Sequence, residues 1–167
     1  LNRSVRANGW QTGSMSGAAV DSSVYLERLA RVRQAMTEHD IDTVLLSVGH
    51  DLPYLTGYTA MPLERLTMLV VPRTADATMV IPALEAPRVR EVPGAFDLLP
   101  WGETQDPTAL VARLAAGSSR IAVGDQMWAR FLVELLAQLP GAQYTRAVEV
   151  VGPLRMSKDM AEIEALA

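Results

Sequence analysis

The stretch Thr43–Gly57, TVLLSVGHDLPYLTG, decides the fold class of this 167-residue chain. Its first part, Thr43–Val48, is an apolar and β-branched run that Gly49 ends, and such a run predicts a buried strand. Asp51–Tyr54 follows as a short helix, with Asp51 expected at the N-cap and Gly57 expected at the end. A buried strand that leads directly into a helix is typical of an α/β domain.

The same alternation of apolar runs continues on both sides of this stretch. Before it, Leu26, Leu29, Val32 and Met36 recur at helical spacing, and Arg28 is expected on the polar face of that helix. After it, the sequence predicts strands at 66–71 and 78–81 as a hairpin, a helical stretch at 84–92, a strand at 96–101, a helix from Pro107 capped by Asp106, a strand at 120–123, a helix at 128–139 and a strand at 144–151. The whole predicts a three-layer α/β sandwich, with a mixed sheet of about five to six strands flanked by helices.

The two ends of the chain differ from this globular part. Residues 1–23 are polar and small, and we interpret them as a tag remnant or a flexible lead-in. The folded domain is expected over residues 24–155. Residues 156–167 begin a further helix, with Asp159 and Glu162 in a capping-box pattern. No stop signal follows Leu166, so we expect this helix to be cut short.

Composition excludes several function classes. The net charge is −4, which argues against nucleic acid or an anionic membrane as the main partner. There are no cysteines and only two histidines, so thiol catalysis is excluded and a His-rich metal site in this chain is not expected. No transmembrane or secretory segment is recognised, and a cytoplasmic location is the default expectation. We found no complete catalytic constellation, so we expect no catalytic residues and an inactive chain.

Three polar residues are candidates for lining a substrate. His50 follows the strand at 43–48, where α/β domains bind ligands, although helix capping by Asp51 is the simpler interpretation of that pair. Asp125, after another strand, is likewise expected to cap a helix, and Trp128 is expected in the core. Tyr58 and Arg65 border the loop 59–65, and Arg65 has either a carboxylate ligand or a surface partner in Glu64.

Two motifs resemble one family. The segment from Asp51 through Tyr54 to Gly57-Tyr58 is similar to the Asn-x-x-Tyr-Leu-Thr-Gly-Phe signature of creatinase/prolidase N-terminal domains, with Asp51 and Tyr58 as mild departures. The segment Leu154–Glu164 resembles the family's Leu-Arg-x-x-Lys-x-x-x-Glu-Ile-Glu linker. The resemblance extends over nearly all of the expected folded part, from Val24 to Ala167.

The resemblance implies a role in a larger protein. The parent would be an Xaa-Pro dipeptidase or aminopeptidase, a homodimer in which a catalytic domain binds two divalent metals (Mn, Co or Zn) and cleaves short Xaa-Pro peptides. This chain would be the non-catalytic N-terminal domain, serving dimerisation and covering the active site. Arg65, Tyr58 and His50 would then line the substrate. Two alternatives stay open: the N-terminal domain of a creatinase-like amidinohydrolase, and a protein-interaction domain of a pseudo-enzyme.

Overall fold

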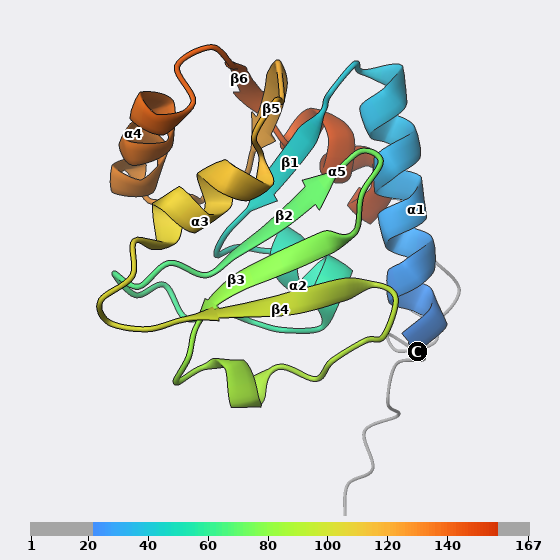
Figure 1. The fold of residues 1–167 in the computed structure, drawn as a ribbon. Coiled ribbons are helices and arrows are strands. Elements are labelled where there is room, and N and C mark those ends of the chain that lie inside the picture. The colour runs from blue at the N-terminus through green and yellow to red at the C-terminus, as the bar shows by residue number, and fades with distance from the viewer. Residues whose placement is uncertain (1–21, 157–167) are drawn as a thin grey trace, which may run out of the picture.

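The computed structural model describes residues 22–156, which form a six-stranded sheet between two layers of helices (Figure 1). The strands are β1 (Thr43–Leu46), β2 (Met68–Pro72), β3 (Ala77–Pro82), β4 (Phe96–Trp101), β5 (Arg120–Val123) and β6 (Gln143–Arg146). The helices are α1 (Ser22–Glu38), α2 (Asp51–Thr56), α3 (Pro107–Leu114), α4 (Ala129–Gln138) and α5 (Val148–Met156), with one 3-10 turn, η1 (Ala86–Arg88).

The sheet is mixed, in the order β4-β3-β2-β1-β5-β6. Strands β1, β2 and β3 are antiparallel neighbours, and the predicted hairpin is formed by β2 and β3. The pairs β3–β4, β1–β5 and β5–β6 are parallel. The predicted fold class, a mixed α/β sandwich, is confirmed.

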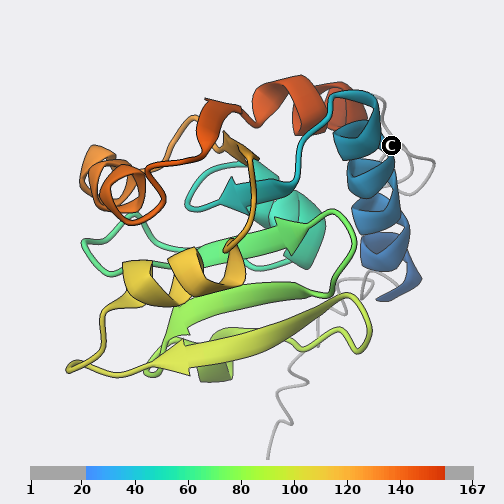
Figure 2. The same cartoon turned by 45° about the horizontal axis from the view of Figure 1, so that its top comes forward.

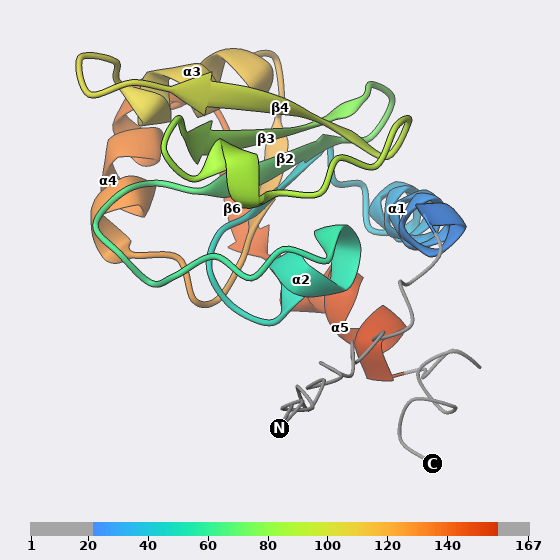
Figure 3. The same ribbon diagram turned by 90° about the horizontal axis from the view of Figure 1, so that it is seen from below.

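Helices cover both faces of the sheet. Helices α1, α2 and α5 lie on one face, and α3 and α4 lie on the other (Figures 2 and 3). The side chains of β1 alternate between the two resulting cores: Val44 and Leu46 belong to the first, and Leu45 to the second. All three are at most 1% exposed. The apolar run that predicted a buried strand is therefore buried on both of its faces.

Three predicted elements differ from the observed ones. The strand expected at 144–151 ends at Arg146, and α5 follows, because the amides of Val150 and Val151 donate to the carbonyl of Ala147. A short apolar run cannot by itself be assigned to strand or helix. The helical stretch expected at 84–92 is reduced to η1. Helix α1 begins at Ser22, two residues before the predicted start of the domain, and the predicted capping pair near residue 160 lies outside the described residues.

Two side chains lie on the side opposite to their prediction. Arg28 was expected at the surface but is only 8% exposed, because its Nη1 donates to the carbonyl of Tyr54 at 2.8 Å and its guanidinium covers the Tyr54 ring at 4.2 Å. Trp128 was expected in the core but is 39% exposed, because it lies at the N-cap of α4, just before the first turn. No helix of the described part is long and apolar enough to cross a membrane.

The end of the sheet opposite the candidate residues is held by one carboxylate. Asp42, just before β1, accepts the backbone amides of Ser119 and Arg120 at 2.9 and 3.0 Å and pairs with Arg73 at 2.7 Å. These contacts join β1, β2 and β5. The hydrogen bonds, led by the Arg120 amide, hold the pKa of Asp42 below its usual range.

We predict that Asp42→Asn destabilises the domain by about 1–3 kcal/mol at neutral pH, because the charge-assisted hydrogen bonds weaken. Since the pKa of Asp42 is lowered on folding, its stabilisation is present above the unfolded value of about 4 and is lost as the pH falls through the folded value. The gap between wild type and variant should therefore close in acid, as measured by urea unfolding at several pH values. Asp76→Asn, at an exposed turn position, is the control. A gap that stays constant with pH would contradict the assignment.

Candidate functional site

A polar crevice lies where β1 and β5 end. These two strands are parallel neighbours, but the helices that follow them lie on opposite faces of the sheet, α2 with α1 and α5, and α4 with α3 (Figure 3). The two connecting loops therefore separate, which is the arrangement that places ligand sites in open α/β sheets. The hollow between them has a volume of about 150 Å³ and is lined by the loops 46–51 and 124–126 together with Val148 and Arg155.

Glycines shape the two loops of this crevice. Gly49 has a φ of +125°, a conformation that only glycine adopts readily, and a Cβ there would lie 2.7 Å from Oε1 of Gln126. Gly124 leaves β5 with its amide donating to the carbonyl of Leu45 at 2.9 Å. The loops therefore approach each other closely across the crevice, and Gly49 is the position at which a side chain would separate them.

The carboxylates of the crevice form ion pairs with arginines. Asp51 accepts from Nη1 of Arg155 at 2.6 Å, which joins α2 to α5. Asp125 is held by both Nε and Nη2 of Arg146, and this fork keeps the pKa of Asp125 below its usual range. His50 lies exposed beside them. The arrangement presents one imidazole next to two ion pairs, with no nucleophile and base in contact.

The two aspartates do not cap helices as predicted. Asp51 is the first residue of α2 rather than its N-cap; His50 has that position and makes no capping hydrogen bond through its side chain. Asp125 lies three residues before the N-cap of α4, Trp128, and turns to Arg146 instead. In both cases an arginine distant in the sequence outcompetes the local backbone amides. Gly57, in contrast, ends α2 in the left-handed conformation as predicted.

Tyr58 lies apart from the crevice, on the segment after α2. Its hydroxyl donates to Oε2 of Glu85 at 2.6 Å, and its amide donates to Oγ1 of Thr56 at 3.1 Å. Burial and then the bond to Glu85 raise the pKa of Tyr58 to about 12, so the phenol stays neutral at physiological pH. It acts here as a hydrogen-bond donor that ties the end of α2 to the turn after β3.

Arg65 occupies a third place, before β2. Its Nη2 pairs with Oε1 of Glu103 at 2.7 Å, with the two side chains 39% and 72% exposed. The predicted surface partner, Glu64, is not the one observed. Nearby, Nε1 of Trp101 donates to the carbonyl of Leu66 at 2.9 Å, which fixes the loop against the end of β4.

The three predicted site residues share one end of the sheet but not one site. His50 follows β1, Arg65 precedes its antiparallel neighbour β2, and the partner of Tyr58 follows β3. The three side chains contact different residues and do not line one common hollow. Arg155 and Arg146 were not predicted as members of the crevice, because their partners are 104 and 21 residues away and no local pattern reports such contacts.

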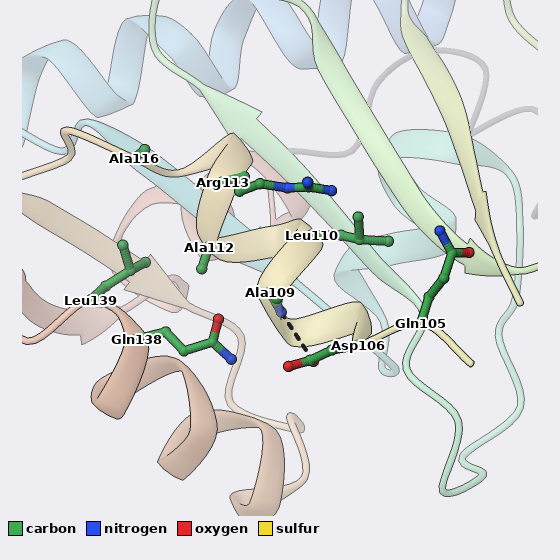
Figure 4. Close-up of a pocket in the computed structure, with 9 residues that line it drawn as sticks. All are labelled: Gln105, Asp106, Ala109, Leu110, Ala112, Arg113, Ala116, Gln138 and Leu139. Atoms are coloured by element: carbon green, nitrogen blue, oxygen red, sulfur yellow. Dashed lines mark hydrogen bonds between the residues drawn. The ribbon is translucent and has the colours of Figure 1, made fainter. Parts of the chain in front are cut away.

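A larger hollow lies between α3 and α4, with a volume of about 610 Å³ (Figure 4). Its one carboxylate, Asp106, accepts the amides of Thr108 and Ala109 at 2.9 and 3.1 Å and so caps α3 as predicted. The Thr108 hydroxyl also donates to Asp106 at 2.7 Å, and this bond, followed by those from the amides, lowers the pKa of Asp106. The other lining residues include Leu110 and Leu139 and the polar side chains of Gln105, Arg113 and Gln138. This hollow is a helix-packing groove, because its carboxylate is already used in capping.

No group of three or more metal-ligating side chains that could hold an ion occurs among the described residues. The crevice offers at most His50 beside two carboxylates that arginines neutralise. We therefore assign no metal site to residues 22–156.

Comparisons with known proteins identify a domain-sized match. The sequence profile of the Creatinase/Prolidase N-terminal domain matches residues 28–157. The probable dipeptidase PepE of Mycobacterium tuberculosis is 33% identical over 156 residues, which cover 91% of this chain and 41% of that protein. The crystal structure of dipeptidase PepE from Mycobacterium ulcerans matches with a TM-score of 0.78 and 34% identity, over 87% of this chain and 40% of that one.

A separately solved domain has the same fold. The N-terminal domain of Xaa-Pro dipeptidase from Lactobacillus brevis matches with a TM-score of 0.68, over 77% of this chain and 98% of that one. At 22% identity this likeness concerns the fold alone. The chain thus spans about two fifths of the PepE dipeptidases and nearly the whole of a domain solved by itself.

We predict that Gly49→Ala destabilises the domain by about 1–3 kcal/mol, because the new Cβ meets Gln126 and the backbone conformation is strained. Thermal or urea unfolding measures the loss. Gly141→Ala is the matched control, since a Cβ there meets no atom within 4 Å. Equal stability of the two variants would show that the loops are free to separate.

Proposed function

Because the chain belongs to the creatinase/prolidase N-terminal domain family, we propose that it is the non-catalytic domain of an Xaa-Pro dipeptidase or aminopeptidase. The observation that carries the proposal is the match to PepE dipeptidases at 33–34% identity, in which this chain accounts for about two fifths of the length. The rest of the parent protein would bind two divalent metals and cleave the peptide.

The chemistry of the described residues favours a non-catalytic role for this domain. The carboxylates that line the crevice are paired with Arg146 and Arg155, and a carboxylate in an ion pair is a poor general base. We propose that the domain contributes to a homodimer and covers the active site, restricting it to short Xaa-Pro peptides. A cytoplasmic location remains our expectation for the parent.

The end of the sheet that carries the predicted residues suits contact with another part of the protein. Besides Arg65 and His50, this end exposes Met61, Leu63 and Leu84, which are 48%, 40% and 75% exposed. Exposed apolar side chains beside polar ones are typical of contact surfaces. In the proposed arrangement, Arg65 would exchange Glu103 for the carboxylate of a bound peptide.

We predict that the full-length protein hydrolyses an Xaa-Pro dipeptide when supplied with manganese or cobalt, and that the 167-residue chain does not. Release of free proline measures both activities under the same conditions. Metal-dependent hydrolysis by the chain alone would overturn the non-catalytic assignment. Turnover of creatine by the full-length protein, without turnover of Xaa-Pro peptides, would identify an amidinohydrolase instead.

We predict that Arg65→Ala in the full-length protein lowers kcat/KM for an Xaa-Pro dipeptide by roughly tenfold or more, because a charge-assisted hydrogen bond is lost. Glu103→Gln frees the same guanidinium and should leave kcat/KM unchanged or raise it. Arg130→Ala, which removes an exposed i,i+4 pair on α4, is the control. If Arg65→Ala and Arg130→Ala behave alike, Arg65 does not contact the substrate.

A further inference from the structure

A second polar hollow lies on the face of the sheet that carries α1 and α2, away from the crevice. It has a volume of about 210 Å³ and is bordered by the first turn of α1, the end of α2 and the segment after η1. The lining residues are Ser22, Tyr25, Thr56, Gly57, Tyr58, Arg88, Arg90 and Val92. At about 30 Å³ per water molecule, it has room for a ligand the size of an amino acid.

Two arginines, one at the end of η1 and one just after it, line the same hollow. Val89 is extended, with φ −83° and ψ 125°, and is 7% exposed. Arg88 and Arg90 flank this buried residue in the sequence. Both are exposed, and both line the hollow.

These two guanidinium groups have no carboxylate partner among the described residues. Six other arginines, Arg65, Arg73, Arg120, Arg130, Arg146 and Arg155, each pair with an aspartate or glutamate. Arg31, Arg33 and Arg113 also have no such ion pair among the described residues, but they do not line this hollow. The acidic side chain nearby, Glu85, accepts the hydroxyl of Tyr58 at 2.6 Å. The hollow therefore carries positive charge that the described part of the chain does not neutralise by an ion pair.

The rest of the lining of this hollow is tightly packed and partly apolar. Gly57 has a φ of +71°, and a Cβ there would lie 2.5 Å from the hydroxyl of Tyr25, so that hydroxyl lies directly over the backbone of Gly57. Val92 and the two tyrosine rings supply apolar surface beside it. Such a wall favours an organic anion with a small apolar body over a bare inorganic ion.

We propose that this hollow binds the carboxylate of a small organic acid or short peptide, with Arg88 and Arg90 holding its oxygens. A guanidinium presents a planar fork of donors that matches a carboxylate, and two forks that line one hollow can hold one anion between them. The site is separate from the crevice and from Arg65. It needs no metal, and its occupancy does not depend on the proposed peptidase activity.

The test is a titration of the 167-residue chain, followed by the amide signals of its two-dimensional NMR spectrum. The probes are N-acetyl-L-proline, its amide N-acetyl-L-prolinamide, and inorganic phosphate. We expect N-acetyl-L-proline to shift the signals of Gly57, Tyr58 and residues 88–92 saturably, with Kd on the order of millimolar. We expect the amide, which lacks the carboxylate, to leave them unchanged.

Substitutions assign the effect to the two arginines. The double variant Arg88→Gln and Arg90→Gln should weaken binding roughly tenfold or more. Arg113→Gln, at an exposed α3 position, should bind as the wild type does. Equal shifts with the acid and its amide, or shifts with phosphate but not with N-acetyl-L-proline, would overturn the carboxylate assignment. Unchanged binding by the double variant would remove the arginines from the site.

Discussion

Burial of β1 on both faces is the constraint on which the rest of the structure depends. Val44, Leu45 and Leu46 leave no face of this strand that could border water, so helices must cover the sheet on both sides. Like β3, this strand has an antiparallel neighbour on one side and a parallel one on the other, here β2 and β5. The loops after β1 and β5 then diverge to opposite layers, and the crevice follows from that divergence.

Local patterns predicted most of this architecture. The apolar run at 43–48, the hairpin around Pro72 and the cap at Asp106 each depend on neighbours in the sequence, and each is present in the structure. The segment 147–151 was assigned wrongly, because its valines suit a strand as well as a helix. Only the packing of α5 against α1 and α2 decides between them.

The candidate site was less predictable for a different reason. His50 and the crevice position follow from the rule for strand ends, but the partners of Asp51, Asp125 and Arg65 are set by contacts across the fold. Arg28 illustrates the same limit: its burial depends on Tyr54, 26 residues away. The sequence alone allows several oppositely charged partners for each charged residue. Only the three-dimensional arrangement selects one of them.

The junction between α2 and α5 has a mechanical consequence. Arg155 holds Asp51 at one end of α2, and the hydroxyl of Tyr54 donates to the carbonyl of Leu154 at 3.2 Å. Two contacts between the same pair of helices oppose both sliding and rotation of one helix against the other. The loop at His50, which leads into α2, is thereby joined through α2 to the last described turn of α5.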